Sequence, residues 1–337
     1  MSSSPPTPAL DPLAEILALG GRALGRRLGA VEERLVEVCR FGRELAFAAE
    51  STISAGGKRL RPLLVFLCAP DGLGGEGGDH EPALVRAAVA VELIHSATLV
   101  HDDVLDGASL RRGRPTVVAS AGREIATATG DLLFSRAFAE LAASFSPTQL
   151  RCLSRASSAL AQGELLQRED AWNADVGIER YLHRCELKTA RLFESACELG
   201  ALAGGAPAPW ASALSAFGRR IGLAFQLLDD VLDVSGPPQR TGKHRGTDLL
   251  DGTTTLPLII ARQRDNGLAA LTLRGLSGAE EAEEVCRRIE RTGALEAARE
   301  QALGIVAAAR EQLPDDLAPR QRQSLELMAQ GVVARYS

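Results

Sequence analysis

The sequence predicts an all-α protein, and three observations support that prediction. Ala, Leu, Glu and Arg, which favour helices, dominate the chain, whereas strong strand formers are few. Hydrophobic residues make up 45% of the 337 residues and aromatic residues only 4%, so a sizeable core must be built mostly from Leu, Ala and Val. Two long, largely apolar runs carry the start and stop signals of helices.

Helix start and stop signals place the elements in chain order. Asp11 followed by Pro12 is a typical beginning for a helix, which we expect over residues 13–49 with breaks near Gly20–Gly21 and Gly29. The Gly-rich segment 71–81 predicts a flexible connection and not a phosphate loop, because no Lys-Ser/Thr pair follows it and no strand precedes it. The remaining helices are expected over residues 63–69, 82–105, from 130 onward, 156–167, 178–202, 210–234, 254–262 and within 278–336.

Composition also narrows the class of protein. The net charge is -5 without a polybasic run, so nucleic acid is not an expected partner. Residues 1–8 lack the features of a signal peptide, and no uninterrupted run of eighteen apolar residues occurs, so we expect no transmembrane segment, although peripheral membrane contact stays open. Six cysteines without C-x-x-C pairing predict buried thiols in a reducing, cytoplasmic setting.

Two copies of the word D-D-V-L-D, at residues 102–106 and 229–233, are the most informative motif. Each ends one of the long apolar runs. On a helix the first and last aspartates of each copy lie on one face, where like charges repel. Repeating this arrangement on two helices that otherwise look buried indicates bound cations, and carboxylate oxygens in this number suit Mg²⁺. Two solvated helix ends are the plainer alternative.

Cationic residues accompany both acidic motifs. Of 38 basic residues only Lys58, Lys188 and Lys243 are lysines, so these positions are candidates for sites where the planar fork of Arg does not fit. The segment 54–62 combines two glycines with three cations, which suits a diphosphate as well as it suits a solvated basic turn. The basic turn 111–115, directly after the first acidic motif, is the expected partner of a bridging phosphate.

These motifs resemble, in order, those of the all-trans polyprenyl diphosphate synthases over residues 54–262. The resemblance implies a single-domain helical bundle of the isoprenoid synthase type over residues 11–337, built around a deep central apolar cavity and usually a homodimer, with residues 1–10 as a disordered tail. It implies condensation of isopentenyl diphosphate with an allylic diphosphate, with about three Mg²⁺ ions per active site. Metals and cations would stabilise the departing diphosphate, and the apolar cavity would keep water from the allylic cation.

The resemblance also implies roles for individual residues. The implied metal ligands are Asp102, Asp103, Asp106, Asp229 and Asp233. The implied contacts to the allylic diphosphate are Arg111, Lys188, Thr189, Gln226 and Lys243. The implied contacts to isopentenyl diphosphate are Gly57, Lys58, Arg61, His95 and Arg112. We expect Asp102, Asp106, Lys188, Asp229 and Lys243 to be catalytic. Relatives often have Lys where this chain has Thr253, and Arg245 is one residue that could take over that role.

Product length depends on how deep the cavity is below Asp102. Ala97 and Thr98, one turn down the helix, and Ile94, a turn further, are the positions where we expect the growing tail to run. Family members that make short products tend to carry aromatic residues at the first two positions, so the small residues here predict geranylgeranyl or longer products. Phe134 or Phe138 on the next helix would then form the cavity floor.

Two other functions remain open from the sequence. A terpene cyclase shares the fold, but usually carries a single D-D-x-x-D motif and lacks the G-G-K-R-L-R-P segment. A non-catalytic subunit of a heteromeric synthase tends to lose one acidic motif, whereas this chain retains both.

Overall fold

The structure is a computed structural model that describes residues 11–40, 43–54, 56–70, 79–111, 113–236 and 244–334. Helices account for most of it, which confirms the predicted all-α class. In the described part the only strands are β1 (Leu110–Arg111) and β2 (Arg114–Pro115), which pair antiparallel. The helices are α1 (Pro12–Val38), α2 (Arg43–Ser54), α3 (Leu60–Leu67), α4 (Glu81–Asp106), α5 (Val117–Ala121), α6 (Arg123–Ala142), α7 (Pro147–Glu169), α8 (Ile178–Cys185), the π-helix η1 (Glu186–Ala190), α9 (Arg191–Ala203), α10 (Ala208–Ser235), α12 (Thr247–Leu250), α13 (Leu256–Arg264), α14 (Asn266–Ala269), the 3₁₀ turn η2 (Leu273–Gly275), α15 (Ala279–Arg291), α16 (Ala294–Glu311) and α17 (Pro319–Ala334).

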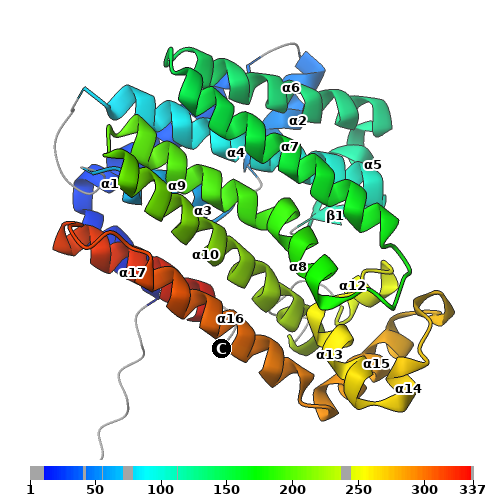
Figure 1. Cartoon of the computed structure of the whole chain (residues 1–337). Helices are drawn as coiled ribbons and strands as arrows, with labels where there is room; N and C mark the ends of the chain where they lie inside the picture. The colour runs from blue at the N-terminus through cyan, green and yellow to red at the C-terminus, as the bar shows by residue number, and fades with distance from the viewer. Residues whose placement is uncertain are drawn as a thin grey trace, which may run out of the picture.

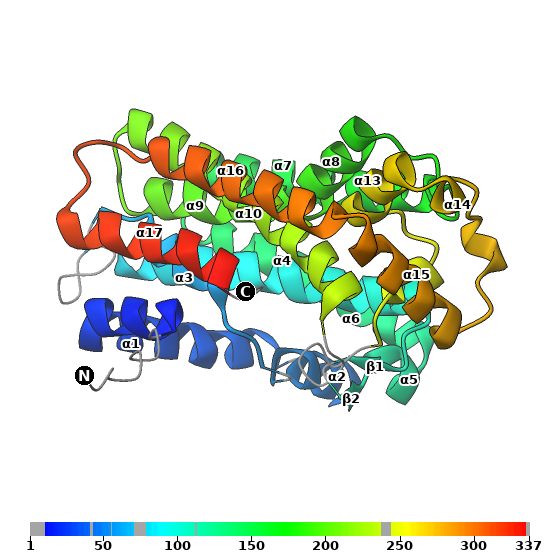
Figure 2. The same ribbon diagram turned by 90° about the horizontal axis from the view of Figure 1, so that it is seen from below.

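Helix α4 is the central element of the bundle. It packs against α1, α3, α6 and α9, and Figure 2 shows it in the middle of the bundle, with α1 below it and α9 and α10 above it. Most of its residues between Leu84 and Val104 are buried, because apolar residues cover all sides of the helix. Among the described helices, α4 alone is long and apolar enough to cross a membrane, but 67% of that stretch is buried inside the protein, as in a core helix.

The remaining long helices form a layer beside α4. Helices α6, α7, α9, α10 and α16 run next to one another in that order, and α17 packs on α1 and α16 (Figure 1). The short helices α12 to α15 gather at the end of the bundle where α4 and α10 end. Both D-D-V-L-D motifs lie at these C-terminal ends, so the packing of α4 and α10 in one bundle brings two distant parts of the sequence to the same end.

Several predicted boundaries differ from the structure. The helix expected over residues 13–49 is two helices, with α1 ending at Val38 and α2 beginning at Arg43. Gly21, at φ +52°, kinks α1 as predicted, but Gly29 lies within the continuous helix. A glycine costs a helix only about 1 kcal/mol relative to Ala, and burial of the neighbouring Val31 and Leu35 offsets that cost.

Gly130 is a second correction, because it does not begin a helix. It lies in the middle of α6, where a Cβ atom would overlap the ring of His101 on α4. Its small size lets α4 and α6 approach closely at the level of the first acidic motif. The stop at Gly107 is as predicted, since this residue caps α4 in the left-handed conformation at φ +63°. All six cysteines are buried and unpaired, as expected.

Candidate active site

A cavity of about 840 Å³ lies between α4, α6, α7, α8, η1, α10, the short helix α12 and the segment that precedes α13. Seven carboxylates and five Arg or Lys side chains are in the lining. The carboxylates are those of Asp102, Asp106, Glu164, Asp229, Asp230, Asp248 and Asp251, and the cations are Arg61, Arg123, Arg168, Arg184 and Lys188. The rest of the lining includes apolar side chains from α4, α6 and α7, namely Leu99, Phe134, Leu160, Ala161 and Leu165.

The two acidic motifs contribute different residues to the cavity. Asp102 and Asp106 from α4 line it together with Asp229 and Asp230 from α10. Asp103 points elsewhere. It is buried, its Oδ1 accepts a hydrogen bond from Arg111 Nε at 2.8 Å, and Arg111 Nη2 forms an ion pair with the same oxygen at 2.7 Å. Asp103 and Arg111 are therefore absent from the lining, and their pairing joins the end of α4 to β1.

Asp233, the last aspartate of the second motif, also lies outside the lining. Its carboxylate accepts a hydrogen bond from the backbone N–H of Asp248 at 3.2 Å, and its carbonyl accepts one from Gly246 at 3.0 Å. These bonds fix the segment that begins α12 onto the end of α10. As a result Asp248, which no sequence motif singled out, lies beside Asp229 and Asp230 in the cavity.

Burial and like charges raise the pKa of two aspartates in the cavity. Burial raises the pKa of Asp102 to about 6, and the charges of Glu164 and Asp106 add to this, while Lys188 lowers it. Burial next to Asp248 raises the pKa of Asp230 to about 8, against the opposing effect of its hydrogen bonds. Burial is the main cause of both shifts. The excess of negative charge is seen in the lining itself, where seven carboxylates face five Arg and Lys side chains.

Lys188 and Thr189 lie on the π-helix η1, a single wide turn between α8 and α9. Such turns are frequent at functional sites because they displace side chains from the regular helical positions. Two glycines make room for this turn. A Cβ on Gly163 of α7 would come within 2.6 Å of the backbone nitrogen of Lys188, and one on Gly222 of α10 within 2.7 Å of Ala190 Cα.

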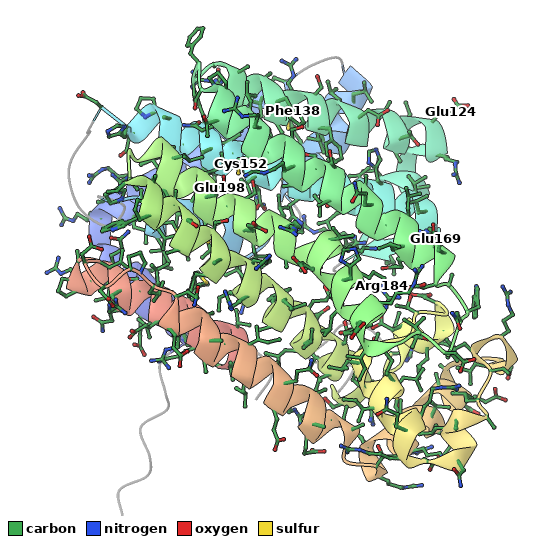
Figure 3. The ribbon with its side chains drawn as sticks, viewed as in Figure 1. Glu124, Phe138, Cys152, Glu169, Arg184 and Glu198 are labelled. Atoms are coloured by element: carbon green, nitrogen blue, oxygen red, sulfur yellow. The ribbon has the colours of Figure 1, made fainter. Side chains whose placement is uncertain are left out.

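Three ion pairs connect Lys188 to the first acidic motif. Lys188 Nζ donates to Glu164 Oε2 at 2.5 Å, and Arg168 donates to both Glu164 and Asp106 at 2.8 Å. The sequence reasoning missed Glu164 and Arg168, although their spacing of four residues at the end of the predicted helix places them on one face. It also missed Arg184, which is buried, pairs with Asp170 and lies at the same end of the bundle as Glu169 (Figure 3).

A buried chain of hydrogen bonds links η1 to the second acidic motif. Thr189 Oγ1 donates to Gln226 Oε1 at 2.7 Å, and Gln226 Nε2 donates to Asp230 Oδ1 at 2.7 Å. Tyr181, which is fully buried on α8, donates to the other oxygen of Asp230 at 2.6 Å. Asp230 thus fixes the orientation of Gln226, and its two oxygens are already engaged.

The basic segment at the start of α3 reaches the cavity through Arg61. The guanidinium of Arg61 stacks over the Phe193 ring at 4.6 Å, its buried Nε has no hydrogen-bond partner, and burial lowers its pKa to about 10. His95 of α4 also lines the cavity, whereas Gly57 and Lys58 are exposed and do not. Arg112 and Lys243, two further predicted contacts, lie outside the described residues.

The predicted positions for chain length divide into two groups. Thr98 and Phe134 line the cavity, and Phe134 also stacks on His101 at 5.8 Å between ring centroids. Ile94 and Ala97 are fully buried in the helix contacts of α4 and are absent from the lining, as is the partly buried Phe138, which is labelled on α6 in Figure 3. Among these five positions the cavity is therefore bounded by Thr98 and Phe134.

Thr253, the position at which the resemblance implies a Lys in many relatives, lies in the cavity lining. Arg245 does not take its place. It donates to Glu283 at 2.9 Å and to Glu290 at 2.5 Å, both on α15, and is absent from the cavity lining.

The donor set of the cavity suits Mg²⁺. The carboxylates of Asp102, Asp106 and Asp229 are hard oxygen ligands. Within the described residues, no three His, Cys, Asp or Glu side chains gather closely enough to hold a metal by themselves. Mg²⁺ fits this arrangement because it usually keeps several waters and binds through one or two carboxylates together with substrate phosphates. A cation here would also favour the charged form of Asp102, whose pKa is raised by burial and by the charges of Glu164 and Asp106.

Comparison with known proteins gives consistent matches. The family model of the polyprenyl synthetases matches residues 43–291. A heptaprenyl diphosphate synthase component 2 from Geobacillus stearothermophilus is 41% identical over 273 residues, covering 80% of this chain and 83% of the relative. A geranylgeranyl diphosphate synthase from Methanosarcina mazei is 37% identical over 275 residues, covering 80% and 83%.

Solved structures agree with these relatives. A decaprenyl diphosphate synthase from Rhodobacter capsulatus superposes with a TM-score of 0.86 at 34% identity, covering 96% of this chain and 99% of its own. A polyprenyl synthase from Caulobacter crescentus, complexed with calcium and isoprenyl diphosphate, superposes with a TM-score of 0.85 at 32% identity, covering 96% and 98%.

Proposed function

This chain belongs to the polyprenyl synthetase family, whose members are prenyltransferases, and from that premise we propose that it condenses isopentenyl diphosphate with an allylic diphosphate. The product would be an all-trans polyprenyl diphosphate of geranylgeranyl length or longer. The observation that supports this best is the composition of one cavity. Asp102 and Asp106 from one helix line it with Asp229 from another and with Lys188, and apolar side chains such as Leu99 and Leu160 line the same cavity.

In this proposal the carboxylates and Lys188 of the cavity hold the allylic diphosphate. Asp102, Asp106 and Asp229 would hold about three Mg²⁺ ions, which when bound neutralise the charge of the diphosphate. Lys188 is placed to contact the same anion, and the hydroxyl of Thr189 and the amide of Gln226 lie beside it. Cleavage of the bond between the allylic carbon and the diphosphate oxygen leaves a delocalised cation, and the apolar lining excludes water that would trap it.

Isopentenyl diphosphate would bind on the other side of the allylic carbon. Arg61 and His95, which line the cavity, are placed to receive its diphosphate, with Lys58 and Gly57 contributed by the exposed loop before α3. Its double bond attacks the cation, forming one carbon–carbon bond, and a proton then leaves, most directly to the released diphosphate. The unpartnered Nε of Arg61 supports this assignment, since a buried guanidinium nitrogen calls for an acceptor.

A product-sizing assay tests the proposal. The purified protein is incubated with Mg²⁺, labelled isopentenyl diphosphate and allylic starters of several lengths, and we expect extension to a product of at least geranylgeranyl length. Termination at farnesyl would contradict the proposed length, and no extension by the protein alone would contradict independent catalysis. Asp102→Ala and Asp229→Ala should each lower kcat by about 10²-fold or more, because each removes charge stabilisation from the transition state. Far-ultraviolet circular dichroism should stay unchanged in both variants.

A second candidate function comes from the names of two relatives. Proteins from Geobacillus stearothermophilus and Bacillus subtilis, 41% and 36% identical to this chain, are each called component 2 of a heptaprenyl diphosphate synthase. This chain could accordingly act together with a different polypeptide instead of as the homodimer that we propose. Both acidic motifs contribute aspartates to the cavity, so in either case we assign the catalytic role to this chain. We also propose that it acts in the cytoplasm.

A further inference from the structure

Arg59 is an unusual residue in the loop before α3. Its backbone has φ +47° and ψ 39°, the left-handed conformation, which costs a residue with a Cβ about 1–2 kcal/mol and which most proteins reserve for glycine. Such conformations persist only where surrounding contacts hold them, and they gather at functional sites. The carbonyl of Arg59 accepts the hydrogen bond from Leu63 that begins α3, so its conformation sets where the helix starts.

The side chain of Arg59 supplies those contacts. Its guanidinium donates to Glu92 Oε1 of α4 at 2.7 Å, to both oxygens of Glu32 of α1 at 2.6 and 3.1 Å, and to the carbonyl of Ile53 at 2.9 Å. Glu92 is 4% exposed, so this ion pair is shielded from water. Removing one partner of such a pair leaves an uncompensated buried charge, which is strongly unfavourable. The guanidinium of Arg59 thus connects α1, the end of α2 and α4.

The position of Glu92 gives this anchor a functional consequence. Glu92 lies three residues before His95 on α4, so the two side chains share a face one turn apart. Arg59 lies between Lys58 and Arg61 in the chain. The ion pair therefore joins the two separate segments, loop and helix, that carry the proposed contacts to isopentenyl diphosphate. Arg59 itself is absent from the cavity lining.

We propose that Arg59 is a positioning residue for isopentenyl diphosphate: its ion pair with Glu92 holds the loop 56–61 at a fixed distance from His95. This inference rests on the proposed function, because it assigns that diphosphate to Arg61 and His95. A loop held in place before the substrate arrives binds it without the entropy cost of ordering the loop. Loss of the Arg59–Glu92 ion pair should weaken the binding of isopentenyl diphosphate alone, because in the proposed function the allylic diphosphate binds to residues of α4, η1 and α10.

Steady-state kinetics of Arg59→Lys and Glu92→Gln test the proposal. Lys keeps the charge but cannot reach three acceptors at once, and Gln keeps the shape but removes the buried charge. For both variants we expect the KM for isopentenyl diphosphate to rise about tenfold, with the KM for the allylic substrate and kcat at saturation within about twofold of wild type. The double variant should be no worse than the stronger single variant, because both break the same contact.

Two further variants separate anchoring from other effects. Arg27→Lys alters another ion pair between α1 and α4, with Glu81 at 2.8 Å, and should lower the melting temperature without changing either KM. Arg59→Gly relieves the backbone strain but removes the anchor, so it should raise the KM for isopentenyl diphosphate as Arg59→Lys does. Equal changes in both KM values, or a change in kcat alone, would overturn the proposal. An inactive wild-type protein would instead count against the proposed function.

Discussion

Lys188 Nζ lies 2.5 Å from Glu164 Oε2 inside the cavity, so the lysine proposed to hold a diphosphate is already paired with a carboxylate of the protein. Glu164 also accepts from Arg168 and raises the pKa of Asp102. A diphosphate that binds Lys188 must compete with this carboxylate or tolerate its charge nearby. Glu164 is therefore the carboxylate with which a diphosphate must compete for Lys188.

Replacing Glu164 should strengthen diphosphate binding. Glu164→Gln removes one negative charge beside Lys188, so we expect inorganic diphosphate to bind about threefold to tenfold more tightly, as measured by calorimetric titration with Mg²⁺ present. We expect kcat to fall, because Arg168 and Lys188 lose the partner that orients them. The matched control is Glu198→Gln, which alters the Arg155–Glu198 pair between α7 and α9, outside the cavity lining (Figure 3). Weaker diphosphate binding in Glu164→Gln would contradict this reading.

The close contact at Gly163 should be required for activity. A methyl group at this position would come within 2.6 Å of the backbone nitrogen of Lys188. Gly163→Ala must therefore displace η1 and with it Lys188 and Thr189. We expect kcat/KM for the allylic substrate to fall about 10²-fold, since misplacement by 1 Å can cost that much. Gly25→Ala is the control: Gly25 lies on α1 with open space around it, and this change should raise the free energy of unfolding by about 0.5–1 kcal/mol without altering activity.

Product length should respond to Thr98 more than to Ala97. The sequence reasoning treated both as positions along the growing chain, and on that basis Ala97→Phe should shorten the product. In the structure Thr98 lines the cavity, whereas Ala97 is fully buried between helices. We now expect Thr98→Phe to shorten the product, as measured by chromatography of the dephosphorylated alcohols. Ala97→Phe should mainly overpack the core and lower the free energy of unfolding by about 1–3 kcal/mol. A shorter product with Ala97→Phe but not with Thr98→Phe would show that the growing prenyl chain runs along Ala97.

The stability of the metal-free protein should depend on the charge of Asp230. Burial raises the pKa of this carboxyl to about 8. At pH values between the ordinary pKa of an aspartate and pH 8, the folded state therefore binds a proton that the unfolded state does not. The free energy of unfolding therefore decreases as the pH rises towards 8, and this contribution is fully present only below the ordinary pKa. We expect the melting temperature in EDTA to fall from pH 5 to pH 8, and Asp230→Asn to reduce that slope. An equal slope in the variant would contradict the shifted pKa.

Much of the fold could be predicted because its signals are local. The helices that became α4 and α10 were found to within two residues, since Pro near each start and Gly after each end act within one turn of the chain. The break between α1 and α2 and the continuity of α6 through Gly130 were missed, because both depend on packing against other helices. The π-helix η1 was missed for the same reason, since Gly163 and Gly222 make room for it from two other helices.

The sequence by itself determined the all-α class and the paired aspartates that end two apolar helices, because helix periodicity and charge spacing are properties of neighbouring residues. It could not decide which members of these motifs face the cavity. The tertiary structure turned Asp103 to Arg111, engaged both oxygens of Asp230 and added Glu164 and Asp248, since each of these outcomes depends on which helix lies opposite. Contacts between residues far apart in the chain arise only when the helices pack, and these contacts set the charge and shape of the cavity.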